Sequence, residues 1–469
     1  MSEQKRKLFE EESVFHAVLQ LALPTIISQI ILVLYNMADT FFIGLTNSDV
    51  MLSAVAVCLP AFMFLSAIAN LFGIGGAATI SRALGSGDRA RAEAAASFSF
   101  WACVTTALLY SLTAFLFRDG FVYLLGGIHR PVRKEAVSYL NVTVVFGGVF
   151  TALNSLLSHL VRSEGRAVKA GIGIALGGVL NIALDPLFMF CILPRGREVY
   201  GAALATMLSN LIACIYFLAL LPGLKRRGSV LNLQFRPRAW EKRTIAEVLK
   251  TGLPACLMTL FENISYAVLD HLIAYGGIAM QAGIGVAKKL NMLAHSIVRG
   301  MAQGVLPLIA YNYGCGNHRR MRRSVLTSAL LSVLLASLCM AVNYIFAAPL
   351  VDLFTPHGPS QRTGTAFLRI LCLGCPFSAF GYVIISYMQA VNKNAKSFLL
   401  AVLRKGVLDI PLMFLLFRLV GVGSTVWATP AADLFCCIAA IGLFAGSLRT
   451  LNSAEARCDQ GVVARGVER

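Results

Sequence analysis

Long apolar stretches separated by short polar ones make up almost the whole chain. Twelve of these stretches approach or exceed the roughly 20 apolar residues that a helix needs to cross a bilayer. They lie at residues 15–43, 51–80, 95–117, 136–160, 168–193, 200–222, 248–275, 280–311, 324–348, 366–391, 396–417 and 422–447. We therefore predict an all-α, polytopic membrane protein with twelve transmembrane helices.

Short motifs along these stretches occur twice, in the same order and about 220 to 230 residues apart. The pairs are Leu23-Pro24 with Leu253-Pro254, Gly85-Ser86-Gly87-Asp88 with Gly314-Cys315-Gly316-Asn317, Leu184-Asp185-Pro186-Leu187 with Leu408-Asp409-Ile410-Pro411-Leu412, and Ala205-Thr206 with Ala428-Thr429. Repeats of this size are typical of secondary transporters. Because six helices return the chain to its starting side, we predict two six-helix bundles that are parallel repeats.

The distribution of Lys and Arg orients the helices. If the N-terminus is cytoplasmic, 26 of the 41 basic residues fall on that side and 8 on the outside, with residues 82–93 and 161–169 counted as cytoplasmic loops. Both termini are therefore predicted to be cytoplasmic. The predicted organisation is 1–14 as an N-terminal segment, 15–222 as the first lobe, 223–247 as a basic linker, 248–447 as the second lobe and 448–469 as a tail.

Composition and motif content limit the classes of function that the chain can have. The chain is 57% hydrophobic and 14% charged, against roughly 25% charged in a soluble domain. The net charge of +18 lies on predicted cytoplasmic loops, where it sets topology and faces anionic lipid, so we expect no nucleic-acid partner. We find no phosphate-binding loop, catalytic triad or metal-ligand spacing. We therefore predict no enzyme activity, cofactor or metal, and uphill transport must use an ion gradient.

Two carboxylates lie inside apolar segments of the first half. Asp39 is in the first segment, and Asp185 is in the fifth, one helical turn after Asn181. Pro186 frees a backbone carbonyl and can kink that helix. Because ionisable residues in membrane segments are costly, the pair can form a cation or proton site. The other interpretation is that Asp39 lies at the water interface and Asp185 caps a helix end.

The second half carries more intramembrane charge. Glu262 is expected near the middle of the seventh segment and facing a cavity, or else hydrogen-bonded to backbone. In the eighth segment, Lys288, His295 and Arg299 share one helix face, a basic stripe that either lines a cavity or pairs with Glu262 or Asp270. The eleventh segment adds three further charged residues: Arg404, Lys405 and Asp409. Lys405 and Asp409 are four apart and can pair, whereas Arg404 has no obvious partner.

With these residues in view, the chain resembles the MATE (multidrug and toxic compound extrusion) family, most closely its MepA-type branch. The resemblance covers about residues 12–450. It rests on Ala22-Leu23-Pro24, Tyr35-Asn36 with Asp39, Phe42-Ile43-Gly44, Asn70-Leu71-Phe72-Gly73, Ile80-Ser81-Arg82-Ala83-Leu84-Gly85, Asn181 with Asp185-Pro186, Gly201-Ala202-Ala203-Leu204-Ala205-Thr206, and Val305-Leu306-Pro307-Leu308-Ile309-Ala310-Tyr311-Asn312. These motifs are specific only in combination.

The resemblance implies two six-helix bundles that form a V around a central cavity. It implies export of amphipathic, mostly cationic drugs in exchange for protons or sodium, by a monomer in the bacterial cytoplasmic membrane, with membrane lipid around it. The implied site residues are Asp39, Asn181, Asp185 and Thr206 for the coupling cation, Pro24 for a bend in the first helix and Glu262 as the acid of the second lobe.

Two departures from the family pattern keep alternatives open. Ser378 stands where NorM-type members have an aspartate, which weakens a cation site in the second lobe. The basic stripe in the eighth segment suits anionic or zwitterionic metabolites, or a lipid-linked saccharide that a flippase would move. A receptor or a membrane-embedded enzyme forms a third class, which no catalytic constellation supports.

Overall fold

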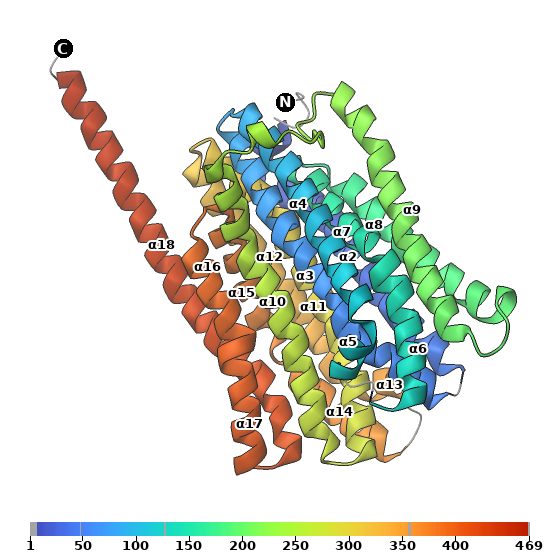
Figure 1. The fold of residues 1–469 in the computed structure, drawn as a ribbon. Helices are drawn as coiled ribbons and strands as arrows, with labels where there is room; N and C mark the ends of the chain where they lie inside the picture. Colours follow the sequence, from blue (N-terminus) through green and yellow to red (C-terminus); the bar gives the residue numbers. More distant parts are fainter. Residues whose placement is uncertain (1–6, 47, 126–127, 355–357, 468–469) are drawn as a thin grey trace.

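Every regular element that the computed structural model describes is a helix (Figure 1), over residues 7–46, 48–125, 128–354 and 358–467. The first half comprises η1 (Lys7–Glu11), α2 (Val14–Gly44), α3 (Asp49–Gly85), α4 (Arg89–Leu116), α5 (Arg118–Leu124), α6 (Arg130–Leu140), η2 (Asn141–Phe146), α7 (Gly148–Ser163), α8 (Ala167–Pro186), η3 (Leu187–Ile192) and α9 (Glu198–Arg226). The second half comprises η4 (Pro237–Ala239), α10 (Lys242–Ala274), α11 (Ile278–Gly314), α12 (His318–Ile345), α13 (Ala347–Asp352), α14 (Pro359–Cys372), α15 (Cys375–Ala390), α16 (Asn394–Val402), η5 (Leu403–Asp409), α17 (Ile410–Leu419), η6 (Val422–Trp427) and α18 (Ala428–Val467).

Nine helices of the described chain are long and apolar enough to cross a membrane, or up to eleven when each of two bent pairs counts as one span. The bent pairs are residues 130–146 with 148–163, at 49°, and residues 359–372 with 375–390, at 43°. The remaining predicted segment, 396–417, corresponds to α16, η5 and α17, a helical run interrupted by a π-helical stretch. All twelve predicted segments therefore coincide with helical runs.

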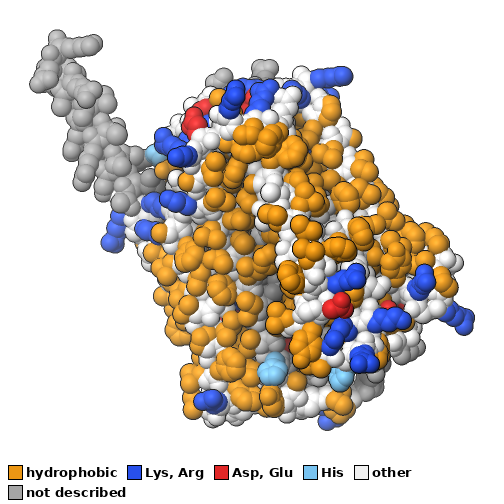
Figure 2. Space-filling view, viewed as in Figure 1, with side chains coloured by type: hydrophobic (Ala, Val, Ile, Leu, Met, Phe, Trp, Pro, Cys, Tyr) orange, Lys and Arg blue, Asp and Glu red, His pale blue; other side chains and the backbone are white. Residues whose placement is uncertain are grey.

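The outer surface is that of a membrane protein. On α12, the leucines at every fourth position are exposed: Leu326, Leu330, Leu334 and Leu338. Figure 2 shows hydrophobic side chains over most of the visible face, with Lys and Arg gathered toward its ends. A continuous apolar surface of this kind is stable against lipid tails rather than water.

The sequence repeat is visible in three dimensions. We call α2–α9 the first bundle and α10–α18 the second bundle. Between them α2 packs on α11, and α3 packs on α10, which is the exchange expected for two equivalent copies. Gly85 at the end of α3 and Gly314 at the end of α11 are equivalent in the repeat, and each lies against the backbone of the helix that carries the other. A Cβ at Gly85 would be 2.1 Å from the Tyr311 backbone oxygen, and a Cβ at Gly314 would be 2.2 Å from the Arg82 backbone oxygen. The parallel repeat is thus built around a close crossing that only glycine permits.

The bundles are held together at the end of the molecule where the N-terminus lies, which we call the terminal side (Figure 1). Gln29 Nε2 donates to Gln303 Oε1 across the junction at 3.1 Å, and Asn70 Nδ2 donates to Thr259 Oγ1 at 2.9 Å. Gln29 and Thr259 lie near the middle of α2 and α10, whereas Asn70 and Gln303 lie in the halves of α3 and α11 nearer the terminal side. Beyond them, toward the opposite side, no hydrogen bond joins α2 or α3 to the second bundle among the residues that the structure describes.

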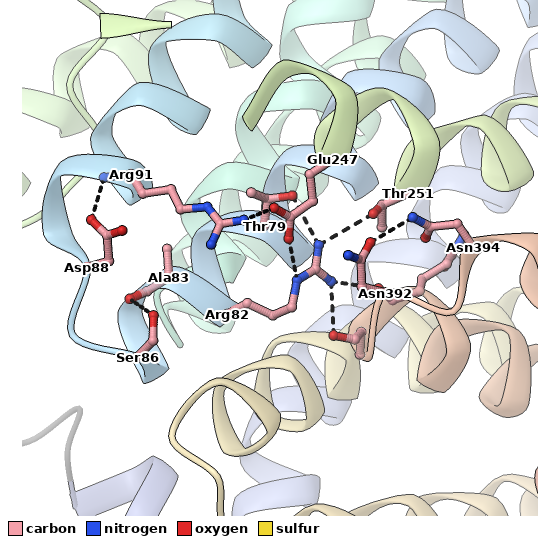
Figure 3. A network of polar contacts seen from close by, with 12 residues as sticks. Thr79, Arg82, Ala83, Ser86, Asp88, Arg91, Glu247, Thr251, Asn392 and Asn394 are labelled. Carbon is pink, nitrogen blue, oxygen red and sulfur yellow. Dashed lines mark hydrogen bonds and ion pairs between the residues drawn. The ribbon is translucent and has the colours of Figure 1, made fainter. Parts of the chain in front are cut away.

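Arg82 joins the two bundles on the terminal side, which we call closed because the bundles are in contact there (Figure 3). Its Nε donates to Glu247 Oε1 of α10 at 2.9 Å, and its Nη1 donates to the backbone oxygens of Gln389 and Ala390 at 2.7 and 2.9 Å. Arg91 pairs with the same Glu247 carboxylate. Arg82 was predicted to belong to a cytoplasmic loop of residues 82–93. The structure places it instead within α3, which continues to Gly85, and the residue is 6% exposed because the second bundle covers it.

The connection between the bundles is shorter than the predicted linker of residues 223–247. Helix α9 continues to Arg226 and α10 begins at Lys242, so Glu247 belongs to a helix. The connecting residues also contact the first bundle, where the Trp101 indole donates to the Leu233 oxygen at 2.8 Å. The functional division into lobes, linker and tail stays a prediction.

Candidate functional site

Close packing of α2 on α8 brings two carboxylates of the first bundle together. A Cβ at Gly178 of α8 would lie 2.7 Å from Ile31 Cγ2 of α2, so the helices approach as only glycine permits. Both helices then continue away from the terminal side for about two turns, to Asp39 on α2 and to Asp185 on α8. There the two carboxylates lie within range of direct charge–charge interaction.

Several oxygen atoms at this place are buried and have no hydrogen-bond donor among the described residues. They are both carboxylate oxygens of Asp185, Oδ1 of Asp39 and Oδ1 of Asn181. Asp185 is 0% exposed and Asn181 is 1% exposed. Because a buried polar atom without a partner costs free energy, such a cluster calls for a proton or a cation.

A chain of amides fixes the orientation of Asn181. Its Nδ2 donates to Thr206 Oγ1 of α9 at 3.2 Å. Asn210, one turn further on α9, donates to the Thr206 backbone oxygen at 2.9 Å and accepts from Asn154 Nδ2 of α7 at 3.0 Å. With its NH₂ group committed to Thr206, Asn181 presents its oxygen to the space near Asp185. Three helices thus hold one acceptor in place.

The backbone changes form directly after Asp185. Helix α8 ends at Pro186, and a π-helical stretch follows over Leu187–Ile192. Proline has no N–H, so it cannot continue the α-helical ladder. Single π-helical turns often accompany functional sites in helices. The predicted disturbance at Pro186 is present as this change of helix type.

The arrangement suits a proton or an alkali cation. It offers two carboxylates and an amide oxygen, which are hard oxygen ligands. Within the described part of the chain, no group of three or more His, Cys, Asp or Glu side chains could hold a metal ion. A monovalent ion or a proton would relieve the repulsion between Asp39 and Asp185 and satisfy their oxygens.

The second bundle contains a buried carboxylate whose contacts differ completely. Asp409 is 0% exposed. Its Oδ2 accepts from Lys405 Nζ at 2.8 Å and from Ser265 Oγ at 2.7 Å, while its Oδ1 accepts from Thr429 Oγ1 at 3.1 Å. Both oxygens therefore have donors, and one of these donors is a cation.

Asp409 and Thr429 are the repeat counterparts of Asp185 and Thr206. Four residues before the aspartate, the first bundle has Asn181 and the second has Lys405. In both bundles the carboxylate also lies next to a π-helical stretch. This stretch follows Asp185 closely in the first bundle and ends at Asp409 in the second. The Lys405 ammonium thus stands where the first bundle leaves acceptor atoms without a partner.

Three further ion pairs lie in the second bundle. Arg299 Nη2 contacts Glu262 Oε1 at 3.1 Å, and Lys288 pairs with Asp270. Arg404 Nε contacts Asp433 Oδ1 at 2.7 Å, and both side chains are 1% exposed. The basic stripe predicted on the eighth segment therefore meets carboxylates, apart from His295, which is buried at 3% exposure.

The structure brings together Asp39, Asn181, Asp185 and Thr206, and it places Glu262 apart from them in the second bundle. Helix α2 runs unbroken through Pro24, so this structure has no interruption of the helix there. The sequence analysis missed Asp433 as the partner of Arg404. The sequence carried a signal for this partner, because Asp433 is a lone acid inside the apolar segment 422–447 and such a residue is expected to be paired.

Comparisons with known proteins agree with this architecture. The family model MatE matches residues 24–187 and 254–415. The multidrug export protein MepA of Staphylococcus aureus strain MRSA252 is 28% identical over 442 residues, which is 94% of this chain and 96% of that protein. A structure described as the outward-facing conformation of a multidrug resistance MATE family transporter of the MOP superfamily superposes with a TM-score of 0.88 at 22% identity, over 97% of this chain and 99% of that one.

A MOP superfamily transporter from Pyrococcus furiosus, described as having a binding pocket of reversed polarity, gives a TM-score of 0.86 at 22% identity. It covers 96% of this chain and 99% of its own. Together with the helices described above, these likenesses confirm the predicted fold.

Proposed function

The chain belongs to the MatE family, and from this membership we propose that it is a multidrug exporter that exchanges amphipathic organic cations for protons or sodium. The relatives named as multidrug export proteins support the export of drugs, since they align over 94% of the chain. Their bacterial origin supports a place in the cytoplasmic membrane, where the apolar outer surface would face lipid.

One observation carries the proposed coupling. Both carboxylate oxygens of Asp185 are buried and have no donor among the described residues, and the same holds for Oδ1 of Asp39 and Oδ1 of Asn181 beside them. A mobile cation or proton would satisfy this cluster. We assign the coupling site to the first bundle only, because Lys405 already neutralises the equivalent carboxylate of the second bundle.

Lys289 supplies a way for the coupling ion to influence how the bundles are arranged. This residue of α11 has no ion pair among the described residues, and its ammonium lies within charge–charge range of Asp39 in the other bundle. A cation or proton at Asp39 would weaken that attraction. Because an ion shifts a conformational equilibrium only by interacting differently with its two states, this contact gives the ion such a difference.

The predicted orientation makes the terminal side cytoplasmic. In that case the bundles are closed toward the cytoplasm by Arg82 and Glu247, with further hydrogen bonds between the bundles deeper along the helices. The likeness to a structure described as outward-facing supports this assignment. Transport would then require these contacts to break and re-form as the molecule alternates between its two states.

Charge pairing in the second bundle bears on the substrate. Its intramembrane bases Lys288, Arg299, Arg404 and Lys405 each contact a carboxylate. They leave little uncompensated positive charge to attract an anion or to repel a cation, which favours cationic substrates. The alternatives of an anionic metabolite or a lipid-linked saccharide remain a second outcome of the test, with Lys289 as the base in their favour.

The test is ethidium efflux from a bacterium that lacks its own efflux pumps. Wild type is compared with Asp39→Asn while the medium is stepped in pH and, separately, in sodium. We expect wild-type export to respond to one of these ions. We expect Asp39→Asn to lose export, since the amide removes the negative charge of Asp39 from the site. Asp119→Asn, an exposed acid of α5, is the matched control and should export normally.

Undiminished export by Asp39→Asn would refute the assigned coupling site. If neither protein exports ethidium while both reach the membrane, and an anionic dye or a lipid-linked saccharide is moved instead, the proposed cationic substrate class is wrong.

A further inference from the structure

A small cavity lies between the two bundles, on the closed terminal side. The first bundle contributes α3 and α7 to its wall, and the second contributes α11 and α15. The lining residues are Ile74, Ala77, His159, Arg162, Gln303, Leu306, Pro307, Ser386 and Gln389.

Arg162 is the one charged side chain among these lining residues. It is 1% exposed. Its Nη1 lies 3.3 Å from Nδ1 of His159, but Nε and Nη2 are buried and have no hydrogen-bond partner in the part of the chain that the structure describes. No ion pair of Arg162 is found within the described ranges. Glu164, the acid nearest in sequence, accepts from Ser229 Oγ and the Val230 N–H, both at 2.7 Å.

The second bundle directs further donors to the same cavity. Gln389 Nε2 is buried and has no partner among the residues described. The backbone oxygen of Gln389 accepts from Arg82, which holds this residue in place. Gln303 accepts from Gln29 through its Oε1, so its own NH₂ group remains a donor. Ser386 adds a hydroxyl. The wall thus presents donors and one full positive charge, and no carboxylate lines it.

A buried guanidinium without a counter-charge is strongly unfavourable. Water could satisfy the donors, but it would not neutralise the charge. We propose that this cavity binds a small monovalent inorganic anion, with chloride as its physiological occupant. One uncompensated charge matches one negative charge. The apolar part of the wall, with Leu306 and Pro307, disfavours strongly hydrated anions such as sulfate or phosphate.

The anion would bridge the two bundles. Arg162 and His159 belong to the first bundle, and Gln303, Ser386 and Gln389 belong to the second. The complete set of donors exists only while the terminal side is closed. An anion in the cavity therefore stabilises this closed arrangement, and opening of the terminal side dismantles the site.

Bromide replaces chloride at most chloride sites and can be located by anomalous scattering. Crystals of the full chain grown in sodium bromide should show an anomalous peak within hydrogen-bonding distance of Arg162. Separately, the melting temperature of the purified protein should rise saturably, by several degrees, when gluconate is replaced by chloride at constant sodium and ionic strength. Arg162→Gln should lose this rise, whereas Arg166→Gln, which lies just before α8 and outside the cavity lining, should keep it.

The absence of a bromide peak at Arg162, or peaks confined to the protein surface, would overturn the proposal. An equal chloride effect on Arg162→Gln and wild type would also overturn it. If Arg162→Gln fails to fold, the bromide experiment on wild type still decides the question.

Discussion

The two bundles repeat one arrangement of helices and treat its buried carboxylate in opposite ways. Within the described ranges, Asp185 has no donor to either oxygen, whereas Asp409 has three donors, one of which is the Lys405 ammonium. The charged donor traces to one position, which is Asn181 in the first bundle and Lys405 in the second. In a duplicated fold, one copy can therefore leave its carboxylate available to a mobile ion, while the other neutralises its carboxylate with the ammonium of its own lysine side chain.

The largest effect expected from this contrast is on stability. Asp409→Asn leaves the Lys405 ammonium buried without its carboxylate, which should destabilise the protein by about 3–5 kcal/mol. The equivalent change Asp185→Asn removes a carboxylate that has no donor, and its effect should stay within about 1 kcal/mol of wild type. Melting temperatures of the purified variants in the same detergent measure the difference.

The double variant Lys405→Met with Asp409→Asn is the control, because it removes both charges of the pair. It should recover most of the lost stability. If Asp185→Asn and Asp409→Asn lower the melting temperature equally, the two sites do not differ as described.

A smaller effect is expected when the second bundle is made to resemble the first. Lys405→Asn leaves Asp409 with its hydroxyl donors Ser265 and Thr429 but without a cation, at a cost of about 1–3 kcal/mol. Protons or sodium should then restore the melting temperature, since either can take the place of the ammonium. A variant that is destabilised equally at all pH values and sodium concentrations would contradict this account.

The smallest effect concerns the support of Asn181. Thr206→Val keeps the side-chain volume and removes the hydroxyl that accepts from Asn181 Nδ2. Loss of one such hydrogen bond, about 0.5–1.5 kcal/mol, should weaken the apparent affinity for the coupling ion by roughly 2- to 12-fold. Ion-dependent ethidium efflux measures this change. Ser209→Ala, a buried hydroxyl one turn along α9, should behave as wild type.

The sequence predicted the elements of this comparison wherever a local pattern carried them. The repeat, the lone Asp39 and the Asn181–Asp185 spacing are visible in the chain itself. The i to i+4 spacing of Lys405 and Asp409 also indicated their contact. These features depend on residues within one or two helical turns, which a linear pattern can report.

Contacts between helices distant in sequence could not be predicted in the same way. Arg404 meets Asp433 from another helix, and Arg82 meets Glu247 across the junction of the bundles. Arg82 and Arg162 were counted as loop charges because each lies at the end of an apolar segment. Burial of their side chains results from packing by the opposite bundle or neighbouring helices, and no local pattern reports such packing.

The central claim is that the coupling ion binds in the first bundle alone. Equilibrium binding of that ion, identified as proton or sodium by the efflux experiment, should be measured on purified wild type, Asp185→Asn and Lys405→Asn. We predict saturable binding by wild type, its loss in Asp185→Asn and an additional binding event in Lys405→Asn. Unchanged binding in Asp185→Asn would contradict the account.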